Sequence, residues 1–151
     1  MNNLNPSQAF PLPKIRGANW NIERVAVLYA RLALGAAFLS GIADRFGLYR
    51  GRNVGYGNFQ GFLGYTAKVN SFMPASTIPF LGWSATFFEF MFGVLLILGI
   101  WTRWVALGSA ALLVLFGTAM AISFGIKAPL DYSVFSASAC SVLVALYGEK
   151  K

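Results

Sequence analysis

The chain has 151 residues, of which 57% are hydrophobic and only 11% are charged. This charged fraction is less than half of the roughly 25% that is typical of soluble domains, so the composition predicts a small integral membrane protein. The net charge of +7 does not indicate nucleic-acid binding, because the basic residues lie scattered at the ends of apolar runs rather than on one face.

The sequence contains no histidine and a single cysteine, Cys140. One thiol cannot form an intramolecular disulfide, a redox-active cysteine pair or a zinc site. Histidine-ligated haem and a di-iron site with Glu-x-x-His ligands are excluded within this chain because both need histidine. We therefore predict no metal site and no intrinsic cofactor, so a redox cofactor would be a bound quinone or would belong to a partner protein.

The first part of the chain divides into an arm, an apolar run and a long connection. Residues 1–24 are polar and contain three prolines, and we expect a cytoplasmic arm there. Since a membrane helix needs about 20 apolar residues, the first transmembrane span is predicted at residues 25–43. The extracytoplasmic loop 44–79 follows, and helical spacing of six of its residues predicts a short helix lying in the membrane interface: Phe59, Phe62, Leu63, Thr66, Val69 and Met73. The alternative is a loop that folds back over the bundle.

Three more apolar runs predict spans at residues 80–100, 104–124 and 132–148, of which the last is short and less apolar at its start. A basic tail, residues 149–151, ends the chain. The predicted fold is all-α, with one polytopic four-transmembrane-helix bundle over residues 25–148 and the interfacial helix in its first long loop.

The basic residues bias the orientation only slightly. With both termini in the cytoplasm, six lysines and arginines lie inside and five outside, while Arg31 lies within the first span. The basic arm and tail favour this orientation, because the long outer loop counts for less.

Small residues recur at every fourth position in three of the predicted spans, a pattern that lets helix backbones approach closely in lipid. They are Ala33, Ala37 and Gly41 in the first span, Gly117, Ala121 and Gly125 in the third, and Ser133, Ala137, Ser141 and Ala145 in the fourth.

Two charged residues lie within the predicted spans, where a lone charge costs about 2.5–3.5 kcal/mol on insertion scales. Arg31 lies early in the first span and Glu89 lies near the middle of the second. Our first hypothesis is an ion pair between them, because an arginine side chain can cover the several ångströms between their depths. The alternatives are a protonated Glu89 that hydrogen-bonds to a hydroxyl, and an Arg31 that extends to the membrane surface.

A second group of polar residues is expected together at the outer face, where the first span ends, the second begins and the fourth begins. Its members are Asp44, Arg45, Lys127, Asp131, Trp83 and Tyr132. One interpretation is a belt of capping and headgroup-contacting residues, which membrane proteins commonly have. The other is an outward-facing polar mouth that holds a small anion or a quinone head.

Residues 25–147 resemble the DoxX family of small four-span membrane proteins, which includes DoxD-like subunits of thiosulfate:quinone oxidoreductase. The resemblance is carried by three segments: "ARLALGAAFLSGIADRFGL", "VNSFMPASTIPFLGWSATFFEFMFGVLLILGIWTR" and "SFGIKAPLDYSVFSASA". It implies a bacterial inner-membrane protein with both termini inside, associated with quinone-linked oxidation or with redox and sulfur enzymes. It supplies no catalytic residues to carry over, so the site residues named above are physical candidates.

Three functions remain open, and the sequence does not decide whether the chain is an enzyme. The first is a membrane subunit of a quinone-linked oxidoreductase, with Glu89 binding the quinone head or relaying a proton. The second, which we favour, is a binding or accessory role in a membrane redox assembly, with a purely structural subunit of a larger non-redox complex as its alternative. The third is a small transporter, which would have to form oligomers because four spans are few for a complete transport pathway. Membrane lipids, including bound lipid, and either a larger complex or further copies of the chain are the expected partners.

Overall fold

The computed structural model describes residues 20–51 and 54–148. Regular structure within this part of the chain is helical, and no strand occurs in it, so the all-α prediction is confirmed there. The elements are α1 (Trp20–Arg45), α2 (Phe59–Val69), the short 3-10 helix η3 (Ala75–Thr77), α3 (Ile78–Leu98), α4 (Thr102–Phe124), α5 (Lys127–Asp131) and α6 (Val134–Tyr147).

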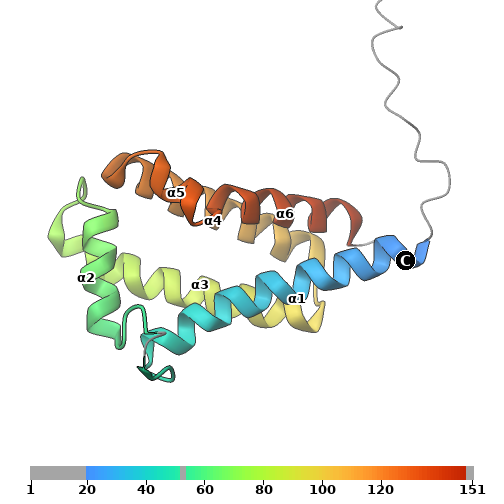
Figure 1. Cartoon of the computed structure of the whole chain (residues 1–151), viewed down its shortest axis with the longest axis horizontal. Helices are drawn as coiled ribbons and strands as arrows, with labels where there is room; N and C mark the ends of the chain where they lie inside the picture. The colour runs from blue at the N-terminus through green and yellow to red at the C-terminus, as the bar shows by residue number, and fades with distance from the viewer. Residues whose placement is uncertain (1–19, 52–53, 149–151) are drawn as a thin grey trace, which may run out of the picture.

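Four helices form a bundle of two pairs, with α1 beside α3 and α4 beside α6 (Figure 1). Helix α2 crosses one end of the bundle, where α1 finishes and α5 lies (Figure 1). We call this the α2 end. Helix α1 begins and α6 finishes at the opposite end.

Three helices are long and apolar enough to cross a membrane, and they correspond to the first three predicted spans: Ile22–Arg45, Ala75–Leu98 and Thr102–Phe124. The fourth predicted span contains the shorter helix α6, whose 14 residues extend about 21 Å at 1.5 Å per residue. Ser133, with a left-handed φ of 55°, separates α6 from α5.

The predicted arm and tail are only partly within the described residues. Helix α1 begins at Trp20, five residues before the predicted span, so the end of the predicted arm is helical. Residues 1–19 and the tail 149–151 lie outside the described residues.

Helix α2 confirms the helical spacing predicted for the long loop. Asn58 caps its start, because the Asn58 side chain accepts a hydrogen bond from the Gly61 amide at 2.8 Å. Its buried residues are Phe62, Thr66 and Val69, which lie on one face and pack on α3 and α4. The predicted helix therefore also folds back over the bundle, and its place in a membrane interface stays a prediction.

The apolar core lies where the two helix pairs meet, and Cys140 packs against it as a partly buried residue. The core consists of Leu34, Phe38, Leu96, Val105, Ala106, Val144 and Ala145. Between α4 and α6, the hydroxyl of buried Ser138 donates to the Ala110 carbonyl at 3.0 Å.

Helices α1 and α3 approach most closely at two glycines. A Cβ added to Gly35 would lie 2.8 Å from the Gly93 carbonyl oxygen, and one added to Gly93 would lie 3.2 Å from the Gly35 carbonyl oxygen. The stripe predicted for the first span is therefore displaced, since Ala33 and Ala37 are exposed. The stripe predicted for the fourth span is buried at Ser141 and Ala145 in α6, whereas Ser133, which precedes α6, is exposed.

We predict that Gly35→Leu destabilises the bundle by about 1–3 kcal/mol, because the new side chain must push α1 away from α3. Thermal unfolding in detergent, followed by tryptophan fluorescence, measures the effect. Ala36→Leu, on the exposed side of the same turn, is the matched control and should unfold like the wild type. Equal behaviour of the two variants would contradict the close approach.

Candidate functional site

The centre of the site is a buried ion pair between Arg45, the last residue of α1, and Glu89 in the middle of α3. The Arg45 Nη2 atom lies 2.8 Å from Glu89 Oε1 and 2.7 Å from Oε2. Both side chains are only 5% exposed. The Arg45 Nη1 atom also donates to the Thr86 hydroxyl at 3.0 Å, and Thr86 donates in turn to the Gly82 carbonyl. Three hydrogen bonds from Arg45 therefore join α1 to α3, and the Thr86–Gly82 bond within α3 orients the Thr86 hydroxyl.

Arg45 reaches Glu89 because helical side chains point back toward the amino terminus of their helix. From the last residue of α1, this direction leads into the bundle. Gly41, one turn earlier, lies beside the pair, since a Cβ there would make an ordinary van der Waals contact with Glu89 Oε2 at 3.5 Å. The Phe62 ring of α2 covers the guanidinium group, with its centroid 3.7 Å from Arg45 Cζ.

The structure pairs Glu89 with Arg45 and not, as the sequence suggested, with Arg31. Arg31 instead donates from Nε to the Leu96 carbonyl at 3.0 Å and from Nη2 to the Ile97 carbonyl at 3.3 Å. These carbonyls belong to the last turn of α3, where a cation is favourable for the helix dipole. Arg31 therefore caps the carboxyl end of α3, at the end of the bundle opposite α2.

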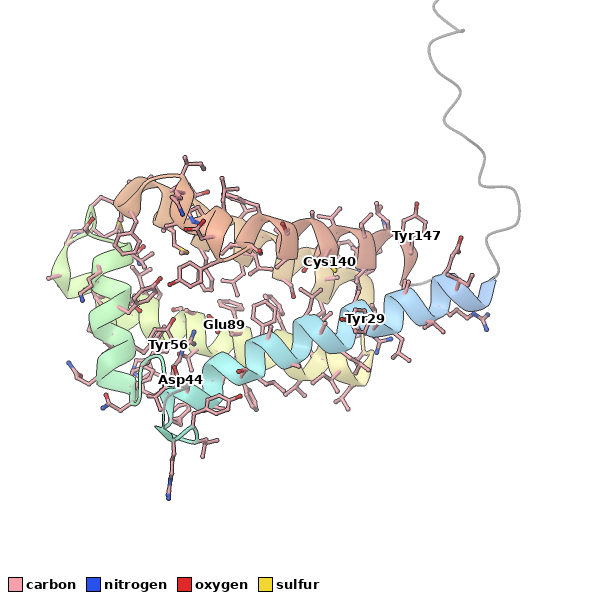
Figure 2. The ribbon with its side chains drawn as sticks, in the orientation of Figure 1. Tyr29, Asp44, Tyr56, Glu89, Cys140 and Tyr147 are labelled. Carbon is pink, nitrogen blue, oxygen red and sulfur yellow. The ribbon has the colours of Figure 1, made fainter. Side chains whose placement is uncertain are left out.

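Asp44, the neighbour of Arg45, holds the following loop against the site. Its buried carboxylate accepts hydrogen bonds from the amides of Gly55, at 3.1 and 3.2 Å, and Tyr56, at 2.7 Å. The Tyr56 ring packs edge-on against Phe62 with a centroid distance of 5.2 Å. Asp44, Tyr56 and Glu89 consequently gather at the α2 end of the bundle (Figure 2).

The predicted outer cluster separates into a buried and an exposed part at this end. Asp44 and Arg45 are buried in the site. Lys127 and Asp131 form an exposed ion pair within α5, and Tyr132 is exposed. Trp83 is exposed as well, with its ring 4.4 Å from that of Phe59. The buried site therefore consists of Asp44 and Arg45 from the predicted cluster together with four residues from outside it: Glu89, Thr86, Tyr56 and Phe62.

A partly open cavity of about 590 Å³ lies beside the ion pair, bounded by α2, α3 and α4. Arg45 and Glu89 are the charged residues that line it, and most of its wall is apolar. Exposed Leu115 and Ile122 are among its lining residues, so it borders the outer apolar surface of the bundle. The apolar lining includes Phe72, Met73, Leu81, Phe88, Leu112, Phe116 and Met120.

Three long apolar helices, a bundle surface rich in exposed apolar side chains and a charge pair buried between helices define a polytopic helical membrane protein. The DoxX family model matches residues 26–129, and the chain belongs to the DoxX family. No curated protein and no solved structure matches the chain.

We predict strong coupling between Arg45 and Glu89. Arg45→Met or Glu89→Leu alone should cost about 3–5 kcal/mol, because each leaves one buried charge unpaired, whereas the double variant should recover most of this loss. Unfolding midpoints of the four proteins in detergent give the coupling free energy. In a parallel double-mutant cycle, the effects of Arg31→Met and Glu89→Leu on the free energy of unfolding should be additive. Coupling in the Arg31 cycle and additivity in the Arg45 cycle would reverse this assignment.

A second prediction concerns Tyr56, because burial, reinforced by nearby Tyr65, raises the pKa of the Tyr56 phenol to about 12. The folded state therefore favours the neutral phenol. This contribution to stability is fully present below about pH 10, the ordinary tyrosine pKa, and is lost as the pH rises through about 12. An absorbance titration of tyrosinate in folded protein should show a late component that Tyr56→Phe removes and the control Tyr49→Phe retains. Loss of that component in both variants, or in neither, would contradict the assignment.

Proposed function

We propose that this DoxX-family protein is a four-span accessory subunit of a redox assembly in the bacterial inner membrane, and that its cavity holds a quinone. The observation that carries the proposal is the combination of an apolar cavity of about 590 Å³ with a buried ion pair on its wall. Cavities of about 300–1,000 Å³ with mostly apolar walls and a few polar groups are typical small-molecule sites.

The residues present fit a quinone in size and chemistry. Phe88 and Phe116 line the cavity, and aromatic side chains suit the flat ring and apolar tail of such a molecule. Arg45 also lines it, and the Arg45 Nε atom is buried without a hydrogen-bond partner in the described part of the chain. An unpaired buried donor is costly unless a ligand or water accepts from it, and a quinone carbonyl oxygen is a suitable acceptor.

An accessory role fits the chemistry of the chain better than independent catalysis. A bound quinone would supply the electron-accepting group, but a chain with one cysteine and no histidine has few means of delivering electrons to it. In the proposal those electrons come from a partner enzyme. The chain's own residues bind and orient the ligand, and α2, packed over Arg45 through Phe62, keeps water from the ion pair.

The four-span topology is supported by where the described helices begin and end. Helix α1 begins and α6 finishes at the same end of the bundle (Figure 1), which an even number of crossings requires. In the proposal α5 and α6 together form the fourth crossing. Both ends of the chain then lie on one side, which the charge distribution favours as the cytoplasm.

The proposal is tested by measuring quinone retained per protein after purification from source membranes into lipid nanodiscs. Ala119 lines the cavity and Ala111 lies exposed on the same helix. Ala119→Phe should lower quinone retention about tenfold, since overpacking by about 1–3 kcal/mol spans that factor. Ala111→Phe should retain quinone like the wild type.

Mass spectrometry of co-purifying proteins examines the accessory role in the same preparation. A stoichiometric redox enzyme supports the proposal. A stoichiometric complex without redox enzymes, together with no retained quinone, would overturn it in favour of a structural subunit of a non-redox complex.

A further inference from the structure

The charge balance beside the cavity distinguishes between classes of lipophilic ligand. Two buried charged side chains line it, the cation Arg45 and the anion Glu89, and buried Asp44 follows as the sequence neighbour of Arg45, so the three sum to one negative charge. All three act electrostatically on Tyr56, so they belong to one neighbourhood. An anionic ligand head would therefore find no net positive charge at this end of the cavity to offset the cost of leaving water.

The hydrogen bonds also indicate that an anionic ligand head does not fit at this end of the cavity. Both carboxylate oxygens of Glu89 accept from Arg45 Nη2, and those of Asp44 accept from backbone amides. A carboxylate or phosphate head would have to displace Glu89 from Arg45, which would leave a buried carboxylate unpaired. A neutral carbonyl needs only one donor, and Arg45, which lines the cavity, has one buried nitrogen, Nε, without a partner in the described part of the chain. A cationic ammonium head has no lone pair with which to accept a hydrogen bond from Arg45.

We infer that the cavity selects an uncharged lipophilic ligand with a hydrogen-bond-accepting head, and that Glu89 sets this selectivity by neutralising Arg45. The inference rests on the proposed function and adds which lipophilic ligands the cavity rejects, namely fatty-acid anions and anionic phospholipid heads. Glu89 is thus a specificity-determining residue as well as a structural one.

Laurate and its methyl ester, each carrying the same diazirine on the tail, are suitable probes because their heads differ in charge and otherwise by a single methyl group. Both are photo-crosslinked to the full chain in phosphatidylcholine nanodiscs, and labelled peptides are mapped by mass spectrometry. At alkaline pH, where the acid is ionised, the ester should label the cavity walls of α3 and α4 more than about tenfold better than laurate. Glu89→Gln should raise laurate labelling toward that of the ester.

Two controls keep the test decisive. Asp131→Asn removes a carboxylate that is exposed outside the cavity and should leave the preference unchanged. If Glu89→Gln does not fold, lowering the pH until laurate is protonated should raise its labelling of the wild type to that of the ester. Equal or stronger labelling by ionised laurate would overturn this inference alone. Labelling of the cavity by neither probe would overturn the proposed function and this inference together.

Discussion

The arrangement of the bundle depends on the cost of placing a charge among apolar helices. Glu89 sits in the middle of α3 and is almost completely buried, and the cost of its charge in that place is lowered when a cation reaches it. Arg45 does so from the end of α1, in the register of α1 on α3 that Gly35 and Gly93 permit. Phe62 then covers the cation and thereby fixes where α2 lies.

The Arg45–Glu89 ion pair both stabilises the bundle and lines the cavity proposed to hold the ligand. Because Arg45 uses Nη1 and Nη2 for Thr86 and Glu89, its charge is neutralised while the Nε atom has no partner in the described part of the chain. The cavity beside it is otherwise apolar and borders the surface that lipid would contact. In the proposal this structural ion pair is also a recognition element, and the two roles are compatible because they use different atoms of one guanidinium group.

The helices could largely be predicted, and the contacts between them could not. Long apolar runs predict α1, α3 and α4, and the spacing of Phe62, Thr66 and Val69 predicts α2. Hydropathy places Arg45 at the edge of its span, however, and only the backward direction of helical side chains directs it to Glu89. That direction is the signal that could have revealed the pair. Likewise, the Ala33 stripe and Gly35 lie on different faces of α1, and sequence alone does not say which face meets α3.

The most direct test of this account is the distance between the Glu89 carboxyl carbon and the Arg45 guanidinium nitrogens in a lipid bilayer. Solid-state NMR dipolar recoupling between ¹³C-labelled glutamate and ¹⁵N-labelled arginine measures it, with Arg45→Lys identifying the pair. The account predicts strong dephasing of the Glu89 carboxyl signal, as expected for atoms in direct hydrogen-bonded contact, and its loss in Arg45→Lys. A signal that does not dephase in the wild type, or that depends instead on Arg31, would contradict the central claim.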